Sequence, residues 1–167
     1  KESEKFKKFK KNLWVYEQQD LGFNYRMTDI SAALGLSQLN RLNEIVIERN
    51  RQHLYYENIF LNTSVSLLKI PKNVYSSFHL QVIQLQNKDI KKYEEVFNGL
   101  RSQGIGVQLH YIPVHLQPYY QDLGFKKGMF PSSENYSRRS FSIPLFPSLK
   151  KSEQIFIKNS ILKLLSN

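Results

Sequence analysis

The 167-residue chain contains no cysteine, which excludes a disulfide scaffold, a thiolate metal site and a cysteine nucleophile. It also lacks any apolar run near the roughly 18 residues that a membrane-spanning helix needs. The basic amino terminus leads into no apolar signal-peptide core, so we expect a cytoplasmic protein without a membrane partner. The motifs GxGxxG, GxxxxGKS/T, HExxH and GxSxG are missing as well, and no nucleophile stands beside a base.

Acidic residues are scarce relative to basic ones: 24 lysines and arginines face 14 aspartates and glutamates, which gives a formal net charge of +10. The basic residues cluster in the first eleven positions and are scattered elsewhere. No aromatic-interleaved motif accompanies them, so we favour a solvated surface over a nucleic-acid partner. A positive surface also steers small anions toward a protein.

Two kinds of hydrophobic pattern divide the chain near residue 62. Before this point a short strand is expected at 13–18, and Thr28 or Asp29 is expected to cap a long helix. The apolar residues of this helix lie on more than one face, and its period continues to Phe60. Such a helix is typical of a segment buried between two domains or two subunits.

The part after residue 62 is predicted to form an α+β unit. Four strands are expected, at 64–70, 78–82, 105–109 and 141–146. The last is predicted to be an edge strand because it contains Pro144, and a loop is expected before it. One helix should begin at Asp89 and stop at Gly104, and another should be capped by Ser148 and run toward the end of the chain.

The segment from Leu21 to Ile30 carries the first group with chemical content. A turn at Gly22 leads into a helix amino terminus, where free N–H groups and the helix dipole favour an anion. Arg26 offers a bidentate partner for phosphate or carboxylate, and Asn24 offers a neutral donor. The alternative is structural: Arg26 pairs with a nearby carboxylate and Asn24 only shapes the turn.

The second group follows the expected strand at 105–109, where His110, Tyr111, Ile112 and Pro113 begin a loop. An imidazole and a flat aromatic ring at a strand end are typical of a ligand-binding position. The alternative is a histidine that caps the strand through a hydrogen bond to backbone, and the residues by themselves favour this alternative.

The other three histidines are expected to have structural roles. We expect His79 to pack inside a strand, His53 to lie on a polar helix face and His115 to lie in a loop. Because no carboxylates are spaced to join them, no metal site is predicted.

Two stretches of the chain, LGFNYRMTDISAALGLSQLNRL and GIGVQLHYIPVHLQPYY, resemble the sugar aminotransferases of the DegT/DnrJ/EryC1/StrS family. With FPSSENYSRRSFSIPLFPSL, the resemblance is strongest to the branch that makes pseudaminic acid precursors. It implies pyridoxal 5'-phosphate as cofactor, glutamate as amino donor, a UDP-linked 4-keto-6-deoxy sugar as substrate and a homodimer. A dTDP- or GDP-linked ketosugar is an alternative substrate. A truncated, non-enzymatic basic binding module is the competing interpretation.

The resemblance covers only the carboxyl-terminal part of such an enzyme. It implies the α/β fold of type I aspartate aminotransferases. Residues 1–62 would then end the large domain and supply connecting and dimer-contact helices, and 63–167 would form a small α+β domain with a mainly antiparallel sheet. The family's Schiff-base lysine matches no lysine in this sequence. We therefore expect the chain, which begins at Lys1 rather than methionine, to be part of a longer protein and to be inactive alone.

The resemblance also assigns roles to individual residues. Asn24 matches an asparagine that reaches across the family's dimer to the cofactor phosphate of the partner subunit. Tyr25 and Arg26 match neighbours that border the same site and the nucleotide-sugar. The segment from His110 to Pro113 matches a loop that lines the UDP-sugar pocket.

Overall fold

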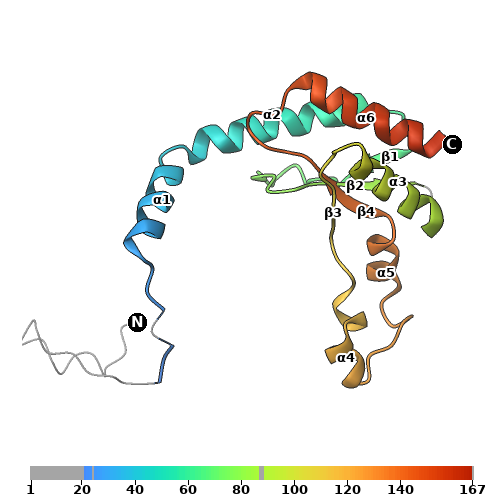
Figure 1. The fold of residues 1–167 in the computed structure, drawn as a ribbon, viewed down its shortest axis with the longest axis horizontal. Helices are drawn as coiled ribbons and strands as arrows, with labels where there is room; N and C mark the ends of the chain where they lie inside the picture. The colour runs from blue at the N-terminus through green and yellow to red at the C-terminus, as the bar shows by residue number, and fades with distance from the viewer. Residues whose placement is uncertain (1–20, 24, 87–88, 167) are drawn as a thin grey trace, which may run out of the picture. The chain divides into compact units, whose positions relative to one another are not determined.

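The computed structural model describes residues 21–23, 25–86 and 89–166 of the chain (Figure 1). The chain divides into two compact units, residues 1–40 and residues 41–167. The strand expected at 13–18 and the side chain of Asn24 lie outside the described residues.

The described part of the first unit contains one helix, α1 (Asp29–Leu39). Thr28 is its N-cap, as predicted, because its hydroxyl accepts a hydrogen bond from the backbone N–H of Ser31 at 3.2 Å. No residue of α1 is buried, and apolar side chains such as Leu34 are exposed.

The second unit is a four-stranded antiparallel sheet that helices cover on one face (Figure 1). The strands are β1 (Val65–Leu67), β2 (Gln81–Leu85), β3 (Gln108–Leu109) and β4 (Ser140–Ile143), in the order β1-β2-β4-β3. The covering helices are α2 (Leu42–Phe60), α3 (Ile90–Ser102) and α6 (Lys151–Ser166). None of the described helices is long and apolar enough to cross a bilayer.

The prediction of one continuous helix from Thr28 to Phe60 is wrong. A turn at Asn40 and Arg41 separates α1 from α2. The side chains of Tyr56 and Phe60 on α2 are buried in the core of the second unit, so α2 belongs to that unit. The structure therefore divides the chain into compact units between Asn40 and Arg41. The boundary expected at 62–63 between the two domains of the enzyme stays a prediction.

The hydrophobic core lies between the sheet and the helices. On the sheet, Ile83 of β2 is paired with Phe141 of β4, and both side chains are fully buried. Tyr56 of α2, Leu100 of α3 and Ile161 of α6 pack in the same cluster and are equally buried. Burying an apolar side chain of this size contributes roughly 1.5–3 kcal/mol, so this layer supplies much of the stability of the unit.

β4 is an inner strand, and its prediction as an edge strand is wrong. It lies between β2 and β3, with Ile143 opposite Gln81 and Ser142 opposite Gln108. The strand ends before Pro144, so the missing proline N–H interrupts no hydrogen bond of the ladder.

The predicted limits hold for α3 and differ for α6. Asp89 caps α3 by accepting a hydrogen bond from its second residue at 2.9 Å, and Gly104 follows the helix with a φ of +76°. α6 begins at Lys151 instead of directly after Ser148. There the carboxylate of Glu153 accepts a hydrogen bond from the N–H of residue 150 at 2.7 Å.

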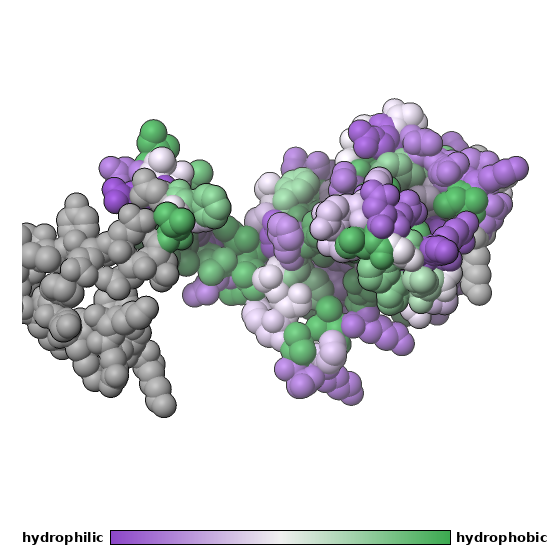
Figure 2. All heavy atoms as spheres, turned by 90° about the horizontal axis from the view of Figure 1, so that it is seen from below, coloured by the Kyte–Doolittle hydropathy of each residue, from purple (hydrophilic) through white to green (hydrophobic). Residues whose placement is uncertain are grey.

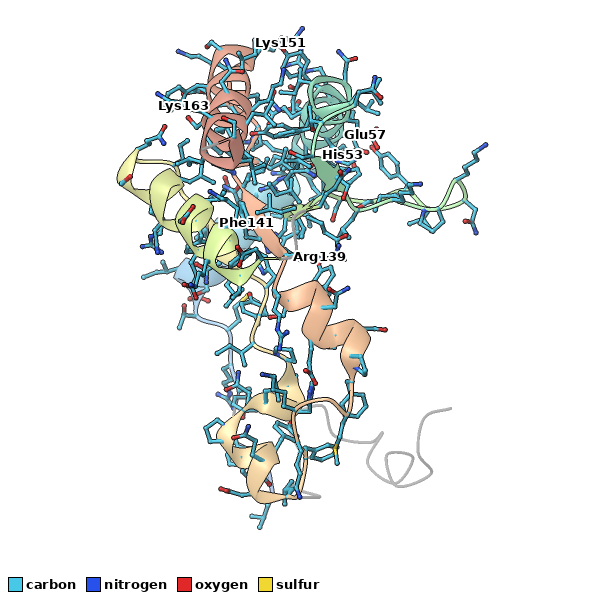
Figure 3. The ribbon with its side chains drawn as sticks, turned by 90° about the vertical axis from the view of Figure 1, so that its right-hand side faces the viewer. His53, Glu57, Arg139, Phe141, Lys151 and Lys163 are labelled. Carbon is cyan, nitrogen blue, oxygen red and sulfur yellow. The ribbon has the colours of Figure 1, made fainter. Side chains whose placement is uncertain are left out.

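Between β3 and β4 the chain leaves the sheet and forms a projecting lobe, residues 110–139 (Figures 1 and 3). The sequence predicts a loop here, and the structure instead forms three short helices. They are the 3₁₀ helix η2 (Val114–Leu116), α4 (Pro118–Asp122) and α5 (Pro131–Ser137). Prolines occupy the first positions of α4 and α5. A backbone N–H at this position has no acceptor within the helix, so its absence in proline costs no hydrogen bond.

Candidate functional site

The segment formed by His110, Tyr111, Ile112 and Pro113 begins the lobe directly after β3. The side chains of Tyr111 and Ile112 are exposed, at 65% and 51%, whereas His110 is half-buried. An exposed aromatic ring and an aliphatic side chain beside a half-buried imidazole suit contacts with an organic ligand.

The imidazole of His110 lies edge-on to the ring of Tyr111, with ring centroids 5.0 Å apart. Its Nε2 is buried and has no hydrogen-bond partner among the described residues, so the backbone cap suggested by the sequence does not form at this atom. Burial lowers the pKa of the His110 imidazole, and the charge of His79 lowers it further. The ring is therefore neutral at pH 7 and keeps a nitrogen available for a ligand.

The backbone of this segment is fixed at two points. The hydroxyl of Ser137 on α5 donates a hydrogen bond to the carbonyl of Tyr111 at 2.8 Å. The N–H of Leu116 donates to the carbonyl of Pro113 at 2.8 Å and thereby starts η2. The segment is thus attached to both η2 and α5.

A buried pair in the lobe was not singled out from the sequence. His115 of η2 and Glu134 of α5 are each 7% exposed, and the His115 Nε2 lies 2.9 Å from the Glu134 Oε1. The backbone N–H of Gly128 donates to the same oxygen at 2.6 Å. The hydrogen bonds from His115 and Gly128 lower the pKa of Glu134. The sequence feature that could have pointed to this pair is that Glu134 is the one glutamate among residues 110–139.

Two other histidines differ from their predicted environments. His53 is buried rather than on a polar face: its Nδ1 lies 2.8 Å from Gln81 Oε1, and its ring stacks on Phe78 at 3.8 Å between centroids. Its Nε2 lies 3.5 Å from the carboxylate of Glu57, which is beside it in Figure 3. His79 is exposed and precedes β2. The described residues contain no group of three or more side chains placed to hold a metal ion.

The other predicted group lies in the first unit. Tyr25 and Arg26 are exposed, and the ring of Tyr25 stacks on Phe23 with centroids 5.7 Å apart. Arg26 makes no ion pair with a carboxylate in the described part of the chain, so its structural alternative has no partner there. Arg26 and the N–H groups of Asp29 and Ile30, which no hydrogen bond within α1 uses, are donors that suit a phosphate, whereas the Asp29 carboxylate in the same turn opposes an anion.

The family model of the DegT/DnrJ/EryC1/StrS aminotransferases matches residues 2–162 of this chain. The chain is 34% identical over 140 residues to the spore coat polysaccharide biosynthesis protein SpsC of Bacillus subtilis, covering 81% of this chain and 36% of that protein. It is 32% identical over 157 residues to the UDP-4-amino-4,6-dideoxy-N-acetyl-beta-L-altrosamine transaminase of Campylobacter jejuni, covering 93% and 42%. It is also 32% identical over 148 residues to the GDP-perosamine synthase of Escherichia coli O157:H7, covering 87% and 38%. The chain thus spans 36% to 42% of the length of these relatives.

Solved structures show the same fold. Helicobacter pylori PseC, an aminotransferase involved in the biosynthesis of pseudoaminic acid, matches with a TM-score of 0.83 and 28% identity, over 94% of this chain and 42% of that chain. Spr1654 of Streptococcus pneumoniae, assigned as a sugar aminotransferase, matches with a TM-score of 0.85 and 25% identity, over 92% and 39%. Spr1654 was solved in apo, PLP and PMP forms. The expected fold class is confirmed.

Proposed function

Because this chain belongs to the DegT/DnrJ/EryC1/StrS aminotransferase family, we propose that it forms the carboxyl-terminal portion of a nucleotide-sugar aminotransferase that uses pyridoxal 5'-phosphate. The observation that carries the proposal is the position of His110–Pro113, a partly exposed segment on a unit whose fold matches known sugar aminotransferases. A cytoplasmic location and a homodimer are part of this proposal.

The described residues fit one end of the cofactor. Arg26 and the first turn of α1 suit its phosphate, and Asn24 is proposed as a further donor to that group from the opposite subunit. The aldehyde end requires a desolvated lysine. Every described lysine is exposed except Lys92 and Lys158, which are half-buried, and Lys92 pairs with a glutamate. When bound, the cofactor carries the amino group between donor and acceptor.

The proposed substrates are glutamate and a UDP-linked 4-keto-6-deoxy sugar. The transaminase of Campylobacter jejuni supports the UDP-linked class. The equal identity to GDP-perosamine synthase supports a GDP-linked ketosugar as the alternative. In both cases the net charge of +10 favours the approach of a diphosphate.

The segment would act through its side chains and its fixed backbone. The neutral ring of His110 can donate or accept one hydrogen bond to a sugar or nucleotide group through its free Nε2. Tyr111 and Ile112 would cover an apolar face of the ligand and exclude water from it. Tyr25 and Arg26 are proposed to border the nucleotide-sugar and its anionic groups.

The activity is tested with the protein expressed from its complete reading frame. Supplied with pyridoxal phosphate, ¹⁵N-glutamate and a UDP-linked 4-keto-6-deoxy sugar, it should form a ¹⁵N-labelled amino sugar that mass spectrometry detects. Parallel reactions with GDP- and dTDP-linked ketosugars identify the nucleotide. If no amino sugar forms from any of the three, the enzymatic proposal fails, and nucleic-acid binding by the same preparation would support a basic binding module.

The role of the segment is tested by a matched pair of variants. Tyr111→Ala should raise the KM for the nucleotide-sugar by about tenfold, because it removes an exposed ring from the proposed contact surface. Tyr119→Ala removes a ring of similar exposure, 70%, from α4 of the same lobe and serves as the control. Equal KM values for the two variants would exclude the segment from substrate binding.

A further inference from the structure

In the lobe, all of which the structure describes, His115 and Glu134 are the two residues whose side chains are buried, and both are titratable. We propose that Glu134, acting through His115, is a positioning residue that holds the segment His110–Pro113 in its binding conformation. This inference rests on the function proposed above for that segment.

The first step of the argument is that one oxygen atom connects three parts of the lobe. Glu134 Oε1 on α5 accepts hydrogen bonds from His115 Nε2 on η2 and from the backbone N–H of Gly128 in the turn before α5. Because an ionised carboxylate only accepts, the proton of this contact must lie on His115 Nε2. Hydrogen bonds to a charged acceptor are about twice as strong as neutral ones.

The second step leads from the buried pair to the segment. One helical turn after Glu134, α5 presents Ser137, whose hydroxyl donates to the Tyr111 carbonyl at 2.8 Å. On the other side, His115 belongs to η2, which begins directly after Pro113. The pair therefore fixes α5 relative to η2, and these two helices hold the segment between them.

The third step is that apolar packing offers the lobe little alternative support. Its aromatic rings touch one another but remain partly exposed, as with Phe125 and Phe130, which lie 6.2 Å apart and are 36% and 47% exposed. Figure 2 shows hydrophobic residues at the surface of this unit on the side toward which the lobe projects. Since hydrophobic stabilisation scales with the area removed from water, partly exposed rings contribute less than core residues.

The test compares Glu134→Ala and Glu134→Gln with the same changes at Glu153 in the complete protein. Glu153 is the matched control because its carboxylate also accepts a backbone N–H at a helix start, on α6, outside the lobe. Glu134→Ala should accelerate hydrogen exchange of the amides of residues 110–112 and 114–116 by about tenfold and raise the KM for the nucleotide-sugar by a similar factor. Glu134→Gln keeps an acceptor oxygen and should restore part of both values.

A positioning role of Glu134 and a general stabilising role predict different effects of the Glu134 variants on the other kinetic constants. The KM for glutamate and kcat should stay within about twofold of the unmodified protein, because the segment is proposed to hold only the nucleotide-sugar. Ser137→Ala cuts the link from α5 to Tyr111 while leaving the buried pair intact. It should accelerate exchange of the amides of residues 110–112 alone, and it provides a test if Glu134→Ala does not fold.

Two results would overturn the inference. One is that the Glu134 variants match the Glu153 variants in exchange and in KM. The other is that both KM values and kcat change together, which indicates general destabilisation. If Glu134→Ala accelerates exchange while Tyr111→Ala leaves the KM unchanged, the substrate role of the segment fails and the mechanical link between Glu134 and the segment stands.

Discussion

At the scale of single residues, the half-buried His110 combines two properties that bear on the charge of its ring. Its Nε2 is buried without a described partner, and its pKa is lowered by burial and by the charge of His79. Both properties disfavour the protonated ring, because a buried charge without a partner is costly. The imidazole of His110 would therefore bind a ligand in its neutral form.

We predict that His110 titrates below the usual histidine value of 6.5. The unfolded chain then binds a proton before the folded chain does, so the contribution of His110 to stability is present above that value and is lost as pH falls toward the lowered pKa. An NMR titration of the imidazole Cε1–H measures the pKa. His79→Asn should move the His110 pKa part of the way back up, and a pKa at or above 6.5 in the unmodified chain would contradict the prediction.

The sequence predicts those features of single residues that depend on near neighbours in the chain. It does not predict those that depend on distant residues. The helix starts expected at Thr28 or Asp29 and at Asp89 depend on neighbours within three residues, and both are confirmed. The burial of His53 and His115 depends on partners far along the chain. A residue pattern does not show which distant side chain will cover a polar group.

At the scale of elements, α2 is attached to the sheet by one arginine as well as by the core. Arg49 Nη1 donates to the carbonyls of Phe78, His79 and Leu145, at 3.0, 2.9 and 3.1 Å. These carbonyls lie just before β2 and just after β4. A single guanidinium thus joins a helix to the ends of two neighbouring strands.

We predict that Arg49→Met lowers the free energy of unfolding by about 2 kcal/mol, the usual loss for a hydrogen bond involving a charged donor. The control is Arg51→Met on the same helix, because the Arg51 side chain is 69% exposed and forms a surface pair with Glu48. Such pairs contribute about 0–1 kcal/mol. Urea denaturation of the two variants measures the difference, and equal midpoints would show that the Arg49 contacts do not stabilise the unit.

The errors among the elements share a cause. The alternating apolar residues correctly predict strands around 65–67 and 141–143, but strand order is a property of the whole sheet. β4 is consequently central although Pro144 suggested an edge. The lobe was predicted as a loop because its helices are too short, at three to seven residues, to show a helical period.

At the scale of the whole molecule, the proposed homodimer would take groups from both subunits at each site. Asn24 lies outside the described residues, and its role toward the cofactor phosphate of the opposite subunit stays a prediction. The positive end of α1 and the neighbouring Arg26 support an anion in this region. Neither observation fixes which subunit provides the phosphate, so the test must separate the two subunits.

In the complete protein, Asn24→Ala should weaken cofactor affinity by about ten- to hundredfold, because a donor to a charged acceptor is lost at a cost of about 1.5–3 kcal/mol. Asn40→Ala, at the other end of α1, is the control. Heterodimers of Asn24→Ala subunits with subunits lacking the cofactor-binding lysine should regain some activity. One of the two sites then takes its lysine from the Asn24→Ala chain and its asparagine from the lysine-deficient chain. Unchanged affinity, or no recovery in a verified heterodimer, would remove the trans-subunit role.

The lobe also leaves and re-enters the sheet at facing positions. Leu109 of β3 is paired with Phe141 of β4, and Cα atoms paired in this way lie about 4.5–5.5 Å apart. The lobe is therefore an insertion between two paired strands, β3 and β4, which would stay adjacent if the lobe were removed.

We predict that replacing residues 111–139 by Asn-Gly, a pair that forms tight hairpin turns, leaves the cooperative thermal unfolding of the second unit intact. Loss of that transition would contradict this prediction. A segment inserted in this way is portable: related enzymes could acquire a different specificity by exchanging this piece of the gene while the sheet beneath it stays unchanged.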